Sequence, residues 1–449
     1  MRVERHIFKE GTAEFKEFNC TCLLTRNLHN VVQWLMRQHF FKHTEKNYTY
    51  DVFEDVKYKY LNYRQIYDYL FKTVNPDFKA LPANVAQEVI RQVVNGEWAS
   101  YRKLIQMKMN GTYDQYVGIP NYLKEAVPYN ATYNRATLSK KNLINGIVNI
   151  PKSNISVKTE HADTLRQVKV SYSTGQYCVD VIYEEPEDEI PAKKATGIYL
   201  AIDCGVDNFA TIVSNAPAFT PLILDGRELK SKNRFFNKKI SVYTEKKALE
   251  DENFHSDEYT RSLWADRKNW FSETMHLYSR RVLDLAELIG AEKIIIGHCN
   301  RWKDKLKIHK GTKQNFAFVP FNLFITDLQY KSVSMGIEIV LQEESYTSKA
   351  SFFDDDYIAV YGDEESEKKF KASGKRVKRG LYRLGDNKHF INADVNGALN
   401  ILRKYLNVSS KEIIPLESMG CVITPVRVRL KELREPKWDY KYIKQFCIF

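Results

Sequence analysis

Apolar residues recur with helical and strand-like periods along the first half of the chain. An apolar stripe over 27–41 predicts a helix, and a longer stripe over 82–109 predicts the clearest helix of this half. Strand-like patterns over 3–24, which include FNCTCLL, and again over 130–185 predict β structure before and after these helices. Pairing of the two β segments would give one small barrel with a helical insertion.

The second half of the chain changes to a pattern of strands alternating with helices, which is typical of an α/β arrangement around a mixed sheet. An acidic, proline-containing stretch at 184–194 precedes the change and predicts a linker and a domain boundary. The expected elements are two strands within 197–215, a long helix at 261–289, a buried strand at 292–298, a helix within 321–335 and a strand at 336–344.

Acidic residues stand at three informative places in this second half. Asp203 lies inside an apolar strand, where a carboxylate would be neutralised unless a cation keeps it ionised. Glu343 and Glu344 close the strand 336–344, and Asp394 lies in a stretch with a helical pattern. Hard cations such as Mg²⁺ prefer carboxylate oxygens, and two of them about 3.5–4 Å apart hydrolyse phosphodiesters. Spacing alone is a weak argument in a chain with 56 acids, so the positions of these acids carry the hypothesis.

Composition narrows the class of protein. The 449 residues exceed what one core usually serves, and 43% hydrophobic with 28% charged residues is an ordinary globular balance. No apolar run approaches the roughly 20 residues of a membrane span, and no secretory signal begins the chain, so we expect an intracellular, cytoplasmic protein without a membrane partner. Seven scattered cysteines without a CxxC pair predict reduced thiols and no structural zinc.

The charge balance suggests a partner. Lys and Arg outnumber Asp and Glu by 68 to 56, which gives a net charge of +12, and 28 Tyr and 24 Phe are spread among the basic residues. This combination suits phosphate neutralisation with base stacking. Composition alone leaves a solvated basic surface as an equally good explanation.

Two motifs carry a family resemblance. IDCGVDNFATI at 202–212 resembles the first RuvC motif of the TnpB-like RNA-guided nucleases, which include the ancestors of compact type V CRISPR effectors, and NADVNGALNIL at 392–402 resembles the third. The likeness covers most of 197–407 and is looser over 1–196. It implies a multidomain α+β and α/β protein, with an RNase-H-like RuvC nuclease domain preceded by a wedge β-barrel that holds a helical recognition lobe.

Domain bounds follow from the resemblance and the linker. The expected parts are a first wedge segment at 1–24, a helical recognition lobe at 25–125, a second wedge segment with the linker at 126–195, a nuclease domain at 196–407 with a non-zinc insertion at about 351–390, and a C-terminal tail at 408–449. The insertion changes from an acidic to a basic stretch. It is either a solvated loop with internal ion pairs or a segment that touches DNA.

The second motif departs from the common family pattern, in which its strand ends in glutamate. Here the strand ends in Gly297, His298 and Cys299. Because consecutive strands of such a sheet lie close together, the pair at the end of the next strand predicts a relocated glutamate. We prefer Glu344 and keep Glu343 as the alternative, since one of two successive residues must face away. Ordinary strand-end charges, and hence an inactive nuclease, remain the other interpretation.

The resemblance implies an RNA-guided DNA endonuclease. A guide RNA would pair with target double-stranded DNA beside a short flanking motif, and Asp203, Glu344 and Asp394 would hold Mg²⁺, with Mn²⁺ as a substitute, for two-metal-ion cleavage. Such a protein would be a monomer or an oligomer of unknown size and nucleoid-associated when bound to DNA. The candidate nucleic-acid contacts are Arg91, Arg102, Lys103, Lys230, Lys303, Lys375, Arg376, Lys378 and Arg379.

Three rival functions stay open at this point. The chain could be a nuclease-inactive, RNA-guided DNA-binding protein that acts like a repressor. It could be a compact CRISPR-associated type V effector of the same fold, or a DNA-cutting transposase proper.

Overall fold

The computed structural model describes residues 1–45, 52–184, 195–298, 319–378, 380–414 and 424–435. It divides into two compact units. The first unit comprises residues 1–188 with 255–265, and the second comprises residues 189–254 with 266–449.

The first unit contains a four-stranded antiparallel sheet in the order β1-β6-β5-β2, in which the first strand of the chain pairs with a strand that follows the helices. This confirms the expected pairing of the two β segments. The strands are β1 (Arg2–Lys9), β2 (Ala131–Asn134), β5 (Leu165–Tyr172) and β6 (Gln176–Tyr183), with a separate pair β3 (Ile147–Asn149) and β4 (Ser156–Lys158).

Helices make up the rest of the first unit. They are α1 (Ala13–Lys42), α2 (Tyr63–Lys72), α3 (Pro76–Ala80), α4 (Ala83–Arg91), a π-helical turn (Gln92–Glu97), α5 (Trp98–Met109) and α6 (Lys140–Ile144). The helical stripe over 82–109 is confirmed as α4, the π-helical turn and α5. The strand expected at FNCTCLL is wrong, because these residues lie in α1. Phe18 and Cys22 are both buried at a spacing of one helical turn, which a seven-residue stretch does not distinguish from alternation.

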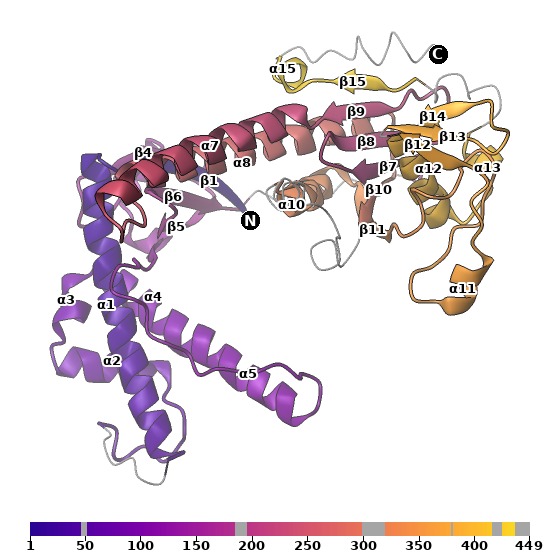
Figure 1. Cartoon of the computed structure of the whole chain (residues 1–449). Helices are drawn as coiled ribbons and strands as arrows, with labels where there is room; N and C mark the ends of the chain where they lie inside the picture. The colour runs from indigo at the N-terminus through magenta and orange to yellow at the C-terminus, as the bar shows by residue number, and fades with distance from the viewer. Residues whose placement is uncertain (46–51, 185–194, 299–318, 379, 415–423, 436–449) are drawn as a thin grey trace. The chain divides into compact units, whose positions relative to one another are not determined.

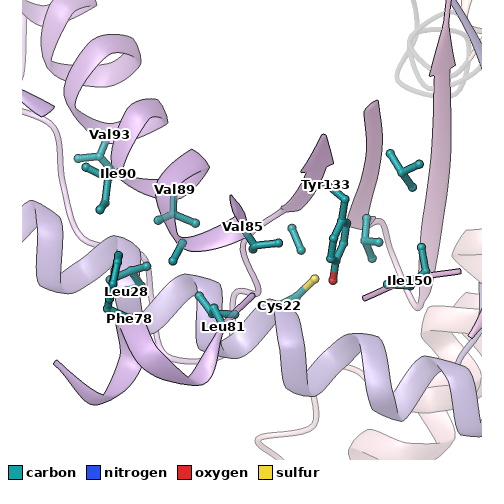
Figure 2. Close-up of a cluster of buried hydrophobic side chains, with 14 of the residues drawn as sticks. Cys22, Leu28, Phe78, Leu81, Val85, Val89, Ile90, Val93, Tyr133 and Ile150 are labelled. Carbon is teal, nitrogen blue, oxygen red and sulfur yellow. The ribbon is translucent and has the colours of Figure 1, made fainter. Parts of the chain in front are cut away.

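The core of the first unit joins α1 to α4 and to the sheet (Figure 2). Cys22 and Leu28 of α1 lie beside Val85 and Val89 of α4, and Tyr133 reaches the same cluster from β2. Burial raises the pKa of Cys22 to about 12, so this thiol stays protonated and unreactive at neutral pH. The two β segments and the helices between them therefore share one core.

The second unit contains a six-stranded mixed sheet in the order β11-β10-β7-β8-β9-β15 (Figure 1). Strands β11, β10 and β7 are parallel, β8 is antiparallel to both of its neighbours, and β15 is parallel to β9. The bounds are β7 (Tyr199–Cys204), β8 (Asn208–Ser214), β9 (Leu222–Asp225), β10 (Lys293–His298), β11 (Glu338–Glu343) and β15 (Val426–Val428). The mixed sheet predicted from the sequence is confirmed.

Helices cover both faces of this sheet. On one face, α8 (Glu258–Leu288) and α10 (Phe321–Ser332) share a core with Leu200 and Ile202 of β7. On the other face, α12 (Ala393–Leu406) shares a core with Ala201. Since side chains alternate along a strand, Asp203 belongs to the same face as Ala201 and points toward α12. The remaining described helices are α7 (Arg227–Glu250), a short 3₁₀ turn (Val333–Met335), α13 (Ser410–Ile413) and α15 (Leu430–Leu433).

The charge-flipped segment at 351–390 is folded. It contains α11 (Glu364–Lys369) and a three-stranded antiparallel sheet of β12 (Lys375–Lys378), β13 (Leu381–Arg383) and β14 (Phe390–Asn392). The buried carboxylate of Asp356 holds it by accepting hydrogen bonds from the backbone N–H groups of Ser351, at 2.7 Å, and Ser373, at 3.0 Å. None of the helices described in either unit carries an apolar stretch of membrane-spanning length.

Candidate active site

Three element ends bring acids to one edge of the six-stranded sheet. Asp203 lies at the carboxyl end of β7, and Glu344 directly follows β11, which runs parallel to it through β10. Asp394 lies in the first turn of α12, where the Asn392 side chain caps the helix by accepting from the Asp394 N–H at 2.9 Å. A helix N-terminus favours a negative charge in its first turn.

Two glycines make room for the carboxylates of Asp203 and Glu344. A Cβ atom added to Gly397 of α12 would lie 2.6 Å from Oδ2 of Asp203, and one added to Gly297 of β10 would lie 2.6 Å from Oε2 of Glu344. Gly297 stands near the strand end where the family pattern has its second-motif glutamate. The carboxylate of Glu344 therefore lies beside the space that a side chain at position 297 of β10 would fill.

The pKa of Asp203 is raised by its burial and by two neighbouring acids. Burial raises it well above its ordinary value, and the charges of Glu344 and then Asp394 raise it further, while Arg376 acts in the opposite direction. Glu344 and Asp394 thus both repel the buried carboxylate of Asp203. A divalent cation would relieve this repulsion and keep Asp203 ionised.

Asp394 already has two hydrogen-bond donors. Arg376 of β12 donates from Nη2 to Oδ1 at 3.0 Å, and Asn208 of β8 donates from Nδ2 to Oδ2 at 2.5 Å. Arg427 of β15 in turn donates from Nη2 to Oδ1 of Asn208 at 2.7 Å. Cationic side chains therefore reach Asp394 directly and through one amide.

Glu343 belongs to a different contact. Lys404 of α12 donates from Nζ to its Oε2 at 2.6 Å, and the backbone N–H of Ser345 donates to its Oε1 at 2.7 Å. Burial acts to raise the pKa of Glu343, but these hydrogen bonds outweigh it and the pKa is lowered. Glu343 thus ties the end of β11 to α12, and Glu344 faces Asp203.

Two of the three acids, Asp203 and Glu344, are placed as ligands of a hard cation would be. Asp203 and Glu344 offer acceptor-only oxygens in spaces left by glycines, as Mg²⁺ and Mn²⁺ require. Among the residues that the structure describes, no three His, Cys, Asp or Glu side chains are arranged to hold one metal ion. Asp394 is bonded to Arg376 in this arrangement, so it would join the other two carboxylates by exchanging the guanidinium for the cation.

The candidate nucleic-acid contacts are spread over both units. In the first unit, Arg91 lies on α4 and ion-pairs with Glu88, while Arg102 and Lys103 are exposed on α5. In the second unit, Lys230 of α7 lies 3.2 Å from Oδ1 of Asp207. Lys375, Arg376 and Lys378 share the exposed strand β12, and Arg376 alone of these reaches Asp394. Lys303 and Arg379 lie outside the described residues.

Residues 176–303 match the family model OrfB_IS605, described as a probable transposase, and residues 321–401 match the Cas12f1-like TNB domain. These two stretches are similar to TnpB-like and Cas12f1-like proteins. This confirms the resemblance seen in the two motifs, since the first match contains Asp203 and the second contains Glu344 and Asp394. No curated protein matches the chain.

Two solved structures show a weak likeness. One is a cryo-EM structure of a Cas12f1–sgRNA–target DNA complex, 14% identical, covering 89% of this chain and 99% of that one with a TM-score of 0.32. The other is a CRISPR–Cas12f ternary complex, 13% identical, covering 84% and 80% with a TM-score of 0.32. A TM-score of this size is too low to establish a common fold.

A methyl group at Gly397 tests the close approach between α12 and Asp203. Gly397→Ala would place its Cβ 2.6 Å from Oδ2 of Asp203, so the Asp203 carboxylate or α12 must shift. We expect a clear loss of any cleavage activity with little change in nucleic-acid binding. Gly96→Ala is the matched control, because its Cβ would meet nothing within 4 Å. Equal activity of the two variants would show that the position of Asp203 does not matter.

Proposed function

We propose that this chain is an RNA-guided DNA endonuclease whose second unit is an RNase-H-like RuvC domain that cuts target DNA with divalent metal ions. The observation that carries the proposal is the approach of Glu344 to Asp203 across two glycines, which restores an acid at the place where β10 lacks one. The matches to a probable transposase family and to a Cas12f1-like domain support the same reaction class.

Asp203, Glu344 and Asp394 would hold Mg²⁺ or Mn²⁺ in this proposal. The bound ions would supply an activated water and would stabilise the leaving oxygen of the phosphodiester. The chain's own side chains do the rest. Burial and the charges of Glu344 and Asp394 raise the pKa of Asp203, and a bound cation would offset these effects and keep its carboxylate ionised. Asn208 would hold Oδ2 of Asp394 by its hydrogen bond. Glu343 stays on Lys404 and takes no part in the reaction.

The first unit would hold the guide RNA and the guide–target duplex. In this proposal the wedge barrel would comprise residues 1–24 and 126–195, and the recognition lobe would comprise residues 25–125. Phosphates would be met by exposed cations, and sequence would be read by base pairing beside a short flanking motif. The proposed contacts in this unit are Arg91, Arg102 and Lys103, and those elsewhere in the chain are Lys230, Lys303, Lys375, Arg376, Lys378 and Arg379.

A copurification experiment tests the guided function. We expect the purified protein to carry a defined RNA, and a target complementary to that RNA to be cut in Mg²⁺ or Mn²⁺ and not in EDTA. Affinity for the target should fall by about 10³–10⁵-fold between 50 and 200 mM salt if roughly 6–10 phosphates are contacted. A zinc-selective chelator should have no effect.

Two results would overturn parts of this proposal. Equal binding of duplex DNA with and without RNA would remove the guided function. A parent protein that binds its RNA-matched target tightly but never cuts it would be a guided DNA-binding protein that has kept the acids without the activity.

A further inference from the structure

We infer that Arg427, on the C-terminal strand β15, positions the carboxylate of Asp394 through the side-chain amide of Asn208. Arg427 touches neither a reacting atom nor Asp394 itself, so it is a positioning residue. The inference rests on the proposed role of Asp394 in cleavage, and it concerns a residue outside both stretches that match family models, which end at 303 and 401.

Two hydrogen bonds form the connection. Arg427 donates from Nη2 to Oδ1 of Asn208 at 2.7 Å, and Asn208 donates from Nδ2 to Oδ2 of Asp394 at 2.5 Å. A guanidinium has donors only, and an ionised carboxylate accepts only. The amide between them therefore has one favourable orientation, with its oxygen toward Arg427 and its NH₂ toward Asp394. Without Arg427, rotation of the amide about its last bond would no longer be opposed on that side.

A buried acid anchors Arg427. Asp225, at the end of β9, is 5% exposed, and Nη1 of Arg427 lies 3.4 Å from its Oδ1. Arg227 binds the same carboxylate more fully, with Nε at 2.9 Å from Oδ1 and Nη2 at 2.5 Å from Oδ2. Burial acts to raise the pKa of Asp225, but hydrogen bonds from Arg227 and the charge of Arg427 outweigh it and the pKa is lowered. Asp225 is thus an ionised anchor shared by two arginines.

The backbone of β15 holds Arg427 in register. Figure 1 shows β15 beside β9, and the parallel pairing places Arg427 opposite Ile223. Val428 and Leu430 are buried in the core of the second unit, and Arg281 of α8 donates to the carbonyl of Leu433 at 3.0 and 2.9 Å. Residues 426–433 therefore belong to the second unit, and they bring Arg427 to the proposed active site.

The two arginines on Asp225 give a matched pair of variants. Arg427→Gln removes the contact to Asn208, whereas Arg227→Gln removes a stronger contact to Asp225 and leaves Asn208 untouched. Both should be compared in the intact ribonucleoprotein by the Mg²⁺ concentration for half-maximal cleavage, by Mn²⁺ binding in electron paramagnetic resonance, and by target binding. Melting temperatures show whether each variant is folded.

We expect Arg427→Gln to raise the half-maximal Mg²⁺ concentration and to weaken Mn²⁺ binding by about 10–100-fold, the usual effect of losing a partner behind a metal ligand. Target binding should stay the same, and Arg227→Gln should change neither metal measurement by more than a few-fold. Asn208→Ala, which keeps the Arg427–Asp225 pair, should reproduce the defect, and the double variant should add nothing to it.

Each other outcome counts against the inference. Equal metal defects in the two arginine variants would show that Asp225 only supports the fold, and normal metal binding in Arg427→Gln would remove the positioning role. A uniform loss of target binding in Arg427→Gln would make Arg427 a phosphate contact. If the parent binds Mn²⁺ but does not cut, the proposed function fails while the Mn²⁺ comparison still decides the role of Arg427. A parent that binds no Mn²⁺ through Asp394 overturns both.

Discussion

Glu344→Gln is expected to reduce target cleavage by orders of magnitude, while Glu343→Gln leaves it close to that of the parent. Glutamine keeps the shape of the side chain but removes the charge that would hold a cation beside Asp203. Glu343 is engaged by Lys404 and Ser345 instead, so its loss should lower stability by only about 0.2–1 kcal/mol, as for a partly exposed ion pair. Cleavage rates at saturating Mg²⁺ and the melting temperature measure the two effects.

Target binding is the control for this pair. Both variants should bind the RNA-matched target as the parent does, because neither glutamate lies among the proposed phosphate contacts. A severe cleavage defect in Glu343→Gln with a mild one in Glu344→Gln would exchange the roles of the two residues. Normal cleavage in both would mean that no glutamate has replaced the missing second-motif acid.

The sequence allowed the three acids to be chosen because each has a local signal. Asp203 interrupts an apolar strand, Asp394 begins an amphipathic helix, and the Glu343–Glu344 pair ends the strand after β10. Side-chain alternation along a strand predicted that one member of the pair faces away. In the structure Glu343 instead binds Lys404 of α12, and Glu344, which follows the last residue of β11, approaches Gly297. Glu344 comes within reach of Asp203 because β10 and β11 are adjacent and parallel.

The supporting residues could not be found in the same way. Asn208 and Arg427 are 219 residues apart, and Asn208 and Asp394 are 186 apart, so only the sheet order and the packing of α12 on the sheet bring them together. The expected C-terminal tail at 408–449 includes no strand, whereas the structure places the three-residue strand β15 of this region in the sheet. Such a short strand leaves no pattern in a sequence.

Local patterns also failed where a stretch was too short. FNCTCLL has apolar residues at positions that suit both an alternating strand and one face of a helix. Thr12 decides between them in the structure, since its side chain accepts a hydrogen bond from the Phe15 N–H and begins a helix of 30 residues. A capping residue placed six positions before the ambiguous stretch was the signal available.

Asp203→Asn is expected to abolish cleavage and also to stabilise the metal-free protein. The substitution removes a carboxylate whose pKa is raised by burial and by Glu344 and Asp394, so it removes an unfavourable charge from the folded state. Asp394→Asn should abolish cleavage without this gain, because Arg376 and Asn208 already compensate the Asp394 carboxylate. Cleavage assays and thermal melting in EDTA distinguish the two variants.

The pH dependence of the melting temperature also distinguishes Asp203→Asn from Asp394→Asn. A carboxyl group with a raised pKa in the folded state binds more protons there than in the unfolded state, so the stability of the metal-free parent should fall as pH rises from its ordinary pKa through the raised one. Asp203→Asn should lose that decline, and Asp394→Asn should keep part of it because burial and Glu344 still raise the pKa of Asp203. Added Mg²⁺ should stabilise the parent more than Asp203→Asn, since a cation that binds only the folded state shifts the unfolding equilibrium. A lower melting temperature for Asp203→Asn than for the parent in EDTA would show that the Asp203 carboxylate stabilises the fold without metal, and the site would then be a structural polar cluster rather than one built for a cation.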